Sequence, residues 1–192
     1  MTESTAVVTA FPSAKPKPRK ASAKVASMIR VNQAGEYGAK RIYKGQLDFL
    51  RNISPETRAT IEHMEEQEQE HLDAFNRQIA TRQVQPTLLT PIWHAAGYAM
   101  GAATALMGEK AAMACTAAVE EVIDEHYQEQ LNELEGEDEE ELRALITKCR
   151  EDELEHRDTA YEHGAAEAPA YPVLSFGIKT ASRMAIWLSK RI

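Results

Sequence analysis

The motif Glu-x-x-His occurs twice, at Glu68–His71 and at Glu153–His156, and each copy lies on an apolar stripe of the sequence. At about 100° per helical residue, the side chains within about 60° of Glu68 are mostly apolar. They are Ile61, Met64, His71, Leu72, Phe75 and Ile79. Nearby acids are oriented differently, since Glu66 and Glu70 point away from this stripe. A helix that packs through the stripe must therefore bury one carboxylate and one imidazole.

Three further helices carry carboxylates on their apolar faces by the same geometry. Glu36 stands in a seven-residue spacing with Ile29, Tyr43 and Leu50. Glu120 shares its face with Met113, Thr116, Ile123, Tyr127, Leu131 and Leu134. Glu153 and His156 share theirs with Leu142, Ile146, Cys149 and Ala160. The neighbouring acids Glu121, Glu151 and Glu155 fall outside these stripes.

Four inward carboxylates and two inward imidazoles need a shared partner, because a buried charge loses its water. No Lys lies on these stripes, and Arg157 is the only Arg near one. We therefore predict a metal centre with the ligands Glu36, Glu68, His71, Glu120, Glu153 and His156. Four carboxylates would neutralise two Fe²⁺ ions. Oxygen and nitrogen ligands suit iron or manganese, and the lack of thiolate ligands argues against zinc–cysteine and iron–sulfur sites.

The spacing of these ligands indicates a duplicated helix pair. Glu36 precedes Glu68 by 32 residues, and Glu120 precedes Glu153 by 33. One Glu from each of two helices and Glu-x-x-His from each of the other two is the ligand arrangement of di-iron and di-manganese four-helix bundles. The expected fold is therefore all-α, a ferritin-like four-helix bundle with two additional apolar helices.

Helices are expected over residues 23–51, 55–84, 92–107, 109–135, 138–163 and from about 172 to the end. The alternating pattern of β-strands is absent. Ser54 can cap the second helix, with Pro55 in its first turn, and Gly164 can end the fifth. Residues 23–192 are expected to form one domain, after a basic, Pro-rich and disordered tail over residues 1–22.

Composition excludes several classes of protein. The net charge of −8 argues against nucleic acid as a partner. The two cysteines, Cys115 and Cys149, form no CxxC pair, so we expect buried free thiols in a reducing compartment. The N-terminus has no apolar core of a secretory signal. The basic tail suits either an anionic membrane surface or a merely solubilising role.

Two segments suit contact with lipid. Residues 84–108 contain no charged residue, although the segment is only modestly hydrophobic. The last helix combines apolar residues and Trp187 with Lys179, Arg183, Lys190 and Arg191. Such a composition favours a helix in the membrane interface. A core or dimer helix and a true membrane span stay open as alternatives.

The chain resembles the demethoxyubiquinone hydroxylases, the di-iron monooxygenases of ubiquinone biosynthesis, from about residue 26 to the end. The stretches that carry the resemblance are RVNQAGEYGAKRIYKGQL from Arg30, EQEQEHLDAFN from Glu66, QPTLLTPIWHAAGYAMGAATALMG from Gln85, MACTAAVEEVIDEHYQEQL from Met113, EDELEHRDTAYEHGA from Glu151 and APAYPVLSF from Ala168. All six predicted ligands match the family's iron ligands, and the resemblance implies that Glu68 and Glu153 bridge the irons. Gln33 replaces a His that is common in the family.

This resemblance implies hydroxylation of the ring of a demethoxyubiquinol, a polyprenyl quinol held in the membrane, with two iron ions and O₂. No Gly-rich dinucleotide motif occurs, so electrons must come from outside, with NADH as the implied ultimate donor. The resemblance also suggests that Tyr127 and His126 lie close enough to the cluster to assist electron transfer, and His126 is a candidate for orienting a ligand.

The resemblance further implies peripheral attachment to the cytoplasmic face of a bacterial cell membrane, or to the mitochondrial inner membrane in a eukaryote. A partner that presents the lipid and an oligomeric state both stay open. Other functions considered for the same bundle are a ferroxidase, a dimetal catalase and a non-enzymatic helical adaptor. The enzymes among them act on small soluble substrates and would not need the uncharged third helix or the Trp-bearing last helix.

Overall fold

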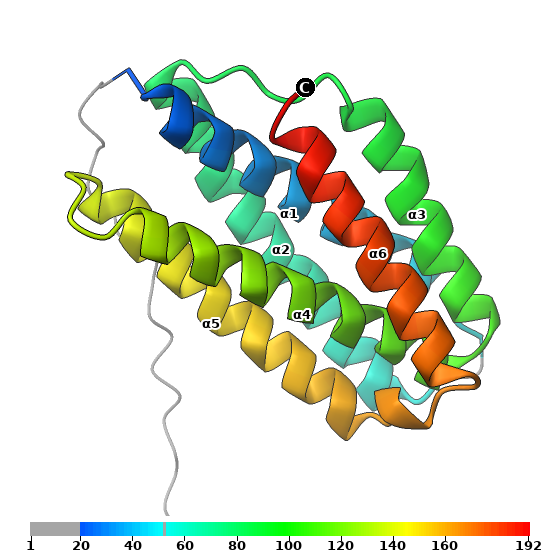
Figure 1. Ribbon diagram of the computed structural model, residues 1–192. Coiled ribbons are helices and arrows are strands. Elements are labelled where there is room, and N and C mark those ends of the chain that lie inside the picture. The colour runs from blue at the N-terminus through cyan, green and yellow to red at the C-terminus, as the bar shows by residue number, and fades with distance from the viewer. Residues whose placement is uncertain (1–19, 52) are drawn as a thin grey trace, which may run out of the picture.

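The computed structural model describes residues 20–51 and 53–192, and these residues fold into helices without a β-strand (Figure 1). The helices are α1 (Ala23–Phe49), α2 (Pro55–Arg82), α3 (Thr90–Leu106), α4 (Glu109–Glu133), α5 (Glu140–Glu162) and α6 (Tyr171–Ser189), with a 3-10 turn at Ala165–Glu167. The all-α prediction is confirmed, and every expected helix is present close to its expected bounds. Most of the predicted disordered tail lies outside the described residues.

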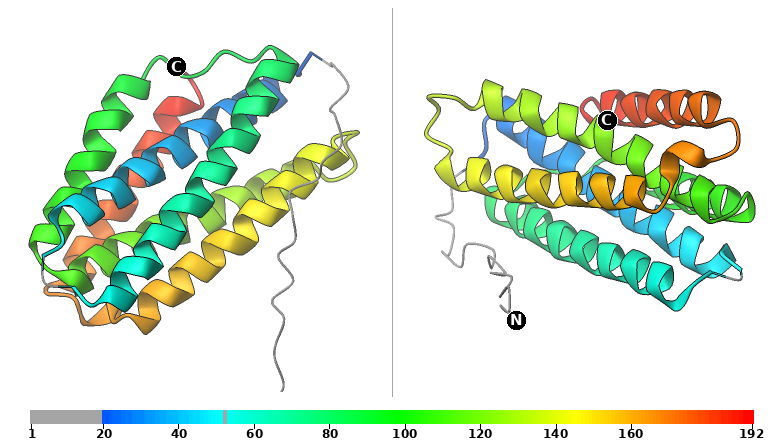
Figure 2. Two further views of the ribbon diagram at one scale, coloured as in Figure 1. Left: turned by 180° about the vertical axis from the view of Figure 1, so that it is seen from behind. Right: turned by 90° about the horizontal axis from the view of Figure 1, so that it is seen from below.

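The bundle consists of α1, α2, α4 and α5. Helix α1 packs against α2, and α4 packs against α5, so each half of the duplication is an adjacent helix pair. Helix α3 covers α1, and α6 covers α4 and part of α1. Figure 2 shows α3 and α6 on one side of the bundle and α2 with α5 on the other. The ferritin-like bundle with two additional helices is therefore confirmed.

Local chemistry explains the helix ends. The Ser54 hydroxyl accepts a hydrogen bond from the Thr57 backbone N–H at 2.9 Å, and Pro55 begins α2, as predicted. Ser22 caps α1 in the same way through Val25. Gly164 follows α5 with a φ of +83°, a left-handed conformation in which glycine carries no Cβ penalty. These signals set the start of α1 and α2 and the end of α5.

Two of the three apolar clusters in the described core lie toward opposite ends of the bundle. One contains Tyr43, Ile61 and Met64, and the other contains Ile29, Phe75 and Ile146. Glu36 and Glu68 lie between these positions in sequence, on the same faces of α1 and α2. The inward polar residues are therefore closed off from water at both ends. Both Cys115 and Cys149 are buried free thiols, as predicted.

Helix α3 approaches α1 at backbone-to-backbone distance, and glycines make this possible. A Cβ added to Gly101 would collide with the carbonyl oxygen of Ile42, and one added to Gly45 would collide with that of Tyr98. Within the described part of the chain, no helix is both long and apolar enough to cross a membrane.

Gly101→Ala should lower the free energy of unfolding by about 3 kcal/mol, because the added methyl group meets backbone that cannot rotate away. Chemical denaturation measures the change. Gly177→Ala in α6 is the matched control, since its added methyl group meets nothing within 4 Å. The control should stabilise the protein by roughly 0.5–1 kcal/mol through helix propensity. Destabilisation of similar size in both variants would contradict the close approach of α1 and α3.

Candidate metal centre

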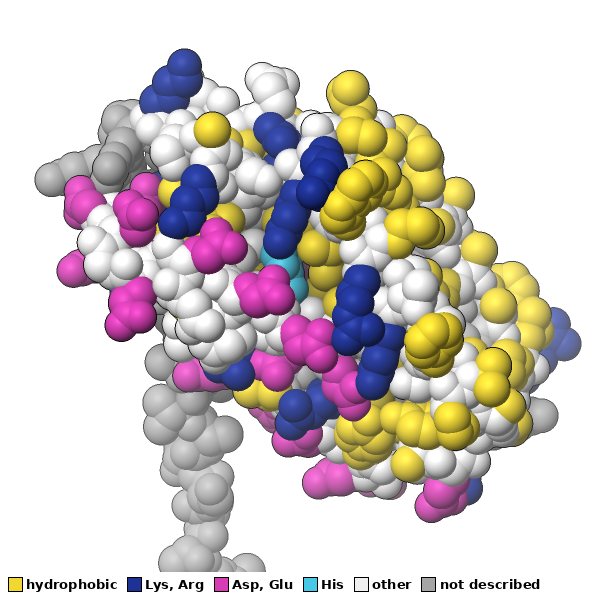
Figure 3. Space-filling model, in the orientation of Figure 1, with side chains coloured by type: hydrophobic (Ala, Val, Ile, Leu, Met, Phe, Trp, Pro, Cys, Tyr) yellow, Lys and Arg dark blue, Asp and Glu magenta, His cyan; other side chains and the backbone are white. Residues whose placement is uncertain are grey.

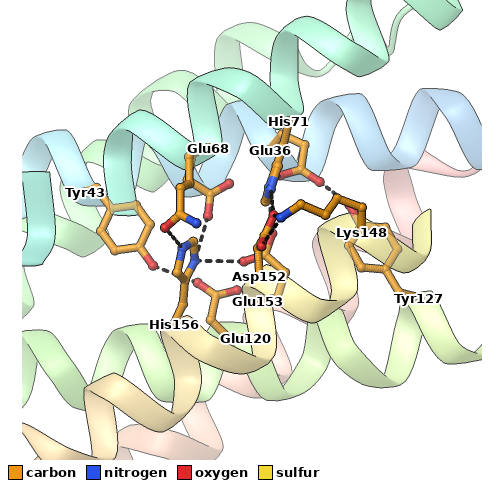
Figure 4. A network of polar contacts seen from close by, with 11 residues as sticks. Glu36, Tyr43, Glu68, His71, Glu120, Tyr127, Lys148, Asp152, Glu153 and His156 are labelled. Atoms are coloured by element: carbon orange, nitrogen blue, oxygen red, sulfur yellow. Dashed lines mark hydrogen bonds and ion pairs between the residues drawn. The ribbon is translucent and has the colours of Figure 1, made fainter. Parts of the chain in front are cut away.

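Six buried residues converge at the middle of the bundle from all four of its helices (Figure 4). They are the residues predicted from the sequence as ligands: Glu36 on α1, Glu68 and His71 on α2, Glu120 on α4, and Glu153 and His156 on α5. None of them is more than 3% exposed. The acids excluded by helical phase are at the surface, since Glu62, Glu66 and Glu70 are exposed and Glu65 is half-buried. On α2 the phase argument therefore separates inward from outward acids correctly.

The donor atoms form two adjacent groups that could each hold a metal ion. One group is Glu36, Glu68, His71 and Glu153, and the other is Glu68, Glu120, Glu153 and His156. Within each group the donor atoms lie within 4.8 Å of one another. Glu68 and Glu153 belong to both groups, which suits carboxylates that bridge two ions.

Both histidines aim Nδ1 at this centre. His71 Nδ1 lies 3.2 Å from Glu153 and 3.4 Å from Glu36, both distances to carboxylate oxygens. His156 Nδ1 lies 3.0 Å from Glu153 and 3.5 Å from Glu68. Each outer nitrogen, Nε2, is held by a residue outside the group of six. Neutral imidazoles with Nε2 protonated would therefore present the Nδ1 lone pair to a metal ion.

Two buried tyrosines hold the two carboxylates that belong to one group only. The Tyr43 hydroxyl donates to Glu120 at 3.0 Å, and the Tyr127 hydroxyl donates to Glu36. These hydrogen bonds fix the orientation of each carboxylate while its second oxygen faces the centre (Figure 4). The two halves of the site are matched in this respect.

Three oxygens at the centre test whether a cation fits. Both carboxylate oxygens of Glu68 and the Oε2 of Glu120 are buried without a hydrogen-bond partner among the described residues. Buried polar atoms are nearly always paired, so an unpaired group of this kind points to an ion. The donor set of carboxylates and imidazoles suits iron or manganese. The residues present therefore fit a pair of divalent cations.

Burial and the closeness of several ionisable groups also shift the pKa values of the cluster carboxylates. Burial, and then the charges of Glu153 and Glu36, raise the pKa of Glu68 well above its ordinary value. Burial, Glu153 and Glu68 do the same to the pKa of Glu120. Burial also opposes ionisation of Glu153, but hydrogen bonds from His156 and His71 outweigh it and lower the pKa of that carboxyl. The histidines thus favour the charged form of Glu153, whereas burial disfavours the charged forms of Glu68 and Glu120, which bound cations would stabilise.

Cys149 lies close enough to Glu36 and His71 to join a metal group. Burial raises the pKa of its thiol well above the ordinary value. Only the thiolate is a good metal ligand, so the protonated side chain is a poor one. This agrees with the absence of thiolates from the predicted ligand set.

His126 is buried but contacts Asn32 at 3.2 Å and Gln130 at 2.8 Å. Burial and the charge of Lys190 lower its pKa to about 3, so the ring is neutral. Its ring lies 6.1 Å from that of Tyr127, which contacts Glu36 directly. Among the described residues, the polar partners of His126 are therefore not the ligands it was a candidate to orient.

Sequence reasoning missed Asp152, Lys148 and Gln67. Asp152 Oδ2 lies 3.0 Å from His71 Nε2, and Lys148 pairs with both oxygens of Asp152. Gln67 Oε1 lies 3.0 Å from His156 Nε2. A signal was available, because Gln67 and Asp152 occupy the same position in the two halves, directly before Glu68 and Glu153.

An apolar cavity of about 310 Å³ lies between the bundle and its two covering helices. Its lining comes from α1, α3, α4 and α6 and includes Ile42, Trp93, Met100, Val119, Ile123 and Ile186. Gly35 and Val119 also line the cavity, and each directly precedes a cluster carboxylate, Glu36 or Glu120. The cavity therefore shares the α1 and α4 walls of the polar centre.

The outer surface of α3 and α6 carries large exposed apolar side chains, which Figure 3 shows gathered on one side of the molecule. We call this surface the apolar patch; it consists of Leu88, Ile92, Leu106, Met107, Val173, Phe176, Met184 and Trp187. Lys and Arg side chains lie beside the patch in the same view. A contiguous patch of this kind usually marks an interaction site.

Comparison with known proteins gives consistent matches. The profile of the family described as "Ubiquinone biosynthesis protein COQ7" matches residues 23–189. The "3-demethoxyubiquinol 3-hydroxylase" of Rhodospirillum rubrum is 54% identical over 164 residues, covering 85% of this chain and 76% of the relative.

Eukaryotic relatives match over a similar length. The human "NADPH-dependent 3-demethoxyubiquinone 3-hydroxylase, mitochondrial" is 49% identical, covering 88% of this chain and 79% of the relative. The Saccharomyces cerevisiae "5-demethoxyubiquinone hydroxylase, mitochondrial" is 45% identical, covering 86% and 77%. All six residues of the centre lie inside the matched residues 23–189.

Proposed function

This chain belongs to the COQ7 family of ubiquinone biosynthesis proteins, and we propose that it is a 3-demethoxyubiquinol 3-hydroxylase, a monooxygenase that hydroxylates the quinol ring. The observation that carries the proposal is the pair of adjacent buried Glu/His groups that share Glu68 and Glu153. Ferroxidases and dimetal catalases act on small soluble substrates, which would not require the apolar cavity beside this centre.

The metal ions would be two irons, held by Glu36, Glu68, His71, Glu120, Glu153 and His156. The unpaired oxygens of Glu68 and Glu120 support this role. Bound iron would supply O₂ activation for insertion of one oxygen atom into a ring C–H bond, which side chains alone do not provide. The reductant would be a reduced nicotinamide. Our sequence expectation is NADH, whereas the name of the human relative specifies NADPH.

The chain's own groups would bind the substrate and control water. The apolar cavity would take the quinol ring or the start of its isoprenoid tail, since its lining is almost entirely apolar. Tyr43 and Tyr127 would keep the two unshared carboxylates in place through their hydrogen bonds. The apolar clusters at both ends of the bundle would exclude bulk water from the reacting atoms. An electron-transfer role of Tyr127 and His126 remains part of the proposal.

The apolar patch would rest on the membrane that holds the polyprenyl quinol. Its apolar side chains and adjacent basic residues suit an interfacial surface facing anionic lipid. In a bacterium this surface would be the cytoplasmic face of the cell membrane, while the names of the human and yeast relatives place those proteins in mitochondria. A lipid-presenting partner protein or a second copy of the chain could share the patch.

Phe176→Glu combined with Trp187→Glu should reduce binding to anionic vesicles by at least about tenfold, because two exposed apolar side chains that would enter the membrane interface become charges. Co-sedimentation measures the bound fraction. Ala144→Glu combined with Thr147→Glu adds the same charge on an exposed surface of α5. That control should reduce binding much less. Equal losses would indicate a general charge effect and not a membrane-facing patch.

Complementation tests the function itself. The chain is expressed in a strain that lacks its own demethoxyubiquinol hydroxylase, and the quinones are then extracted and identified. Conversion of accumulated demethoxyubiquinone to ubiquinone is the expected result. Expression of folded, iron-loaded protein without any conversion would overturn the proposed function.

A further inference from the structure

The outer nitrogens of the two histidines are held by a crossed pair of residues. Asp152 on α5 contacts His71 on α2, with 3.0 Å between Oδ2 and Nε2. Gln67 on α2 contacts His156 on α5, with 3.0 Å between Oε1 and Nε2. Each of these residues directly precedes the shared Glu of its own helix. The duplication therefore supplies the same position twice, and each copy supports the histidine of the other half.

The two supports differ in charge. In both cases Nε2–H donates to an oxygen, and Nδ1 points at the carboxylates of the metal centre. Asp152 accepts as a carboxylate, whereas Gln67 accepts as a neutral amide. A charge-assisted hydrogen bond is roughly twice as strong as a neutral one and makes the imidazole a more basic ligand. Asp152 is buried, and Lys148 holds both of its oxygens, so its position is fixed.

The other residues that contact the ligands are equivalent in the two halves. Glu36 accepts from Tyr127, and Glu120 accepts from Tyr43. Glu68 and Glu153 are common to both donor groups. Cys149 lies only beside Glu36 and His71, as a buried free thiol. The two halves therefore differ chiefly at this position, which holds Asp152 with its partner Lys148 in one half and the neutral Gln67 in the other.

We propose that the two metal positions are unequal: the position formed with Glu36 and His71 binds Fe²⁺ more tightly and fills first, because Asp152 supports its histidine. The position formed with Glu120 and His156, which Gln67 supports, fills second. Asp152 and Gln67 are positioning residues that act through the imidazoles. The inference rests on the proposed di-iron function, since it assigns an order to the same site.

Anaerobic titration of the metal-free full-length protein with Fe²⁺ tests the inequality. Two binding steps are expected, with the first at least about tenfold tighter, since an outer partner of a metal ligand typically affects affinity by about 10–100-fold. Mössbauer spectra identify the position that fills first. Adding one equivalent of Mössbauer-active iron per chain and then one of Mössbauer-silent iron should give a single predominant doublet. Adding the two isotopes in the reverse order should give a different doublet.

Paired substitutions test the assigned cause. Asp152→Asn should bring the two affinities together. Asp152→Asn combined with Gln67→Glu conserves net charge and moves the carboxylate to the other half. That double variant should restore two separated steps and reverse the order of the two doublets. A purely structural role would not reverse the order.

Separate outcomes bear on the two proposals. Equal filling of the two positions in the wild-type protein would overturn the inequality, and a binding order unaffected by the exchange would overturn its assignment to Asp152. Both results would leave the hydroxylase function intact. Failure of the wild-type protein to bind iron at all would instead overturn the proposed function. The wild-type isotope experiment decides the inequality even if a variant folds poorly.

Discussion

Glu153→Ala should abolish iron binding and lower hydroxylase activity by more than about 100-fold, because loss of even an outer partner of a metal ligand can cost 10–100-fold. Glu153 belongs to both donor groups and contacts both histidines. Its removal therefore damages both metal positions at once. The measurements are iron per chain after anaerobic reconstitution and quinol turnover.

Glu151→Ala is the matched control, two residues away on the same helix. Glu151 is exposed, and its substitution should leave the iron content unchanged and the stability within about 0.5 kcal/mol of the wild type. Similar losses of iron in both variants would mean that acid content, and not helical phase, determines metal binding. That result would remove the basis for all six assigned ligands.

Helical phase identifies the metal centre from the sequence because burial follows rotation about the helix axis. Glu68 is fully buried, while Glu66 and Glu70, each two residues away, are exposed. The same logic identifies Glu36, Glu120 and Glu153 on α1, α4 and α5, although Asp152, next to Glu153, is also buried. The helix bounds were also predictable where specific side chains set them, as Ser54 and Pro55 do for α2.

Contacts between helices are less predictable, since they depend on how the helices are rotated against each other. Asp152 is about 100° from Glu153 and looks like a solvated acid in isolation. It is buried because α5 turns that side toward His71 on α2. The cavity is equally hidden in the sequence. It depends on how α3 and α6 cover α1 and α4, and the collision of a Cβ at Gly101 with Ile42 becomes visible only in three dimensions.

The metal-free protein should lose stability as pH rises from about 5 to 8. Burial and neighbouring carboxylates raise the pKa values of Glu68 and Glu120, so the folded state keeps protons that the unfolded state releases above about 4.5. Burial opposes protonation of both His71 and His156. Cys149, Asp152 and Glu153 outweigh it at His71, and Glu153 and Glu120 outweigh it at His156, so both pKa values are raised. All four groups therefore bind more protons in the folded state across this range, and the free energy of unfolding falls with pH.

Glu153 acts in the opposite direction, but at lower pH. Its lowered pKa contributes stability that is present above about pH 4.5 and is lost only as pH falls below that value. The decrease between pH 5 and 8 is therefore not cancelled. We expect Tm of the metal-free protein to fall by at least about 4 °C, corresponding to roughly 2 kcal/mol. Differential scanning calorimetry across this pH range measures it.

Glu68→Gln should separate metal binding from folding. Gln cannot ionise, and its amide can donate to the neighbouring carboxylates of Glu36 and Glu153, so the metal-free variant should be more stable than the wild type at pH 8. With Fe²⁺ the order should reverse, because only the wild type gains the full free energy of metal binding. A variant that is less stable under both conditions would make Glu68 a structural residue. A variant that is more stable than the wild type without Fe²⁺ and less stable with Fe²⁺ would instead show that the Glu68 carboxylate serves metal binding and destabilises the metal-free fold.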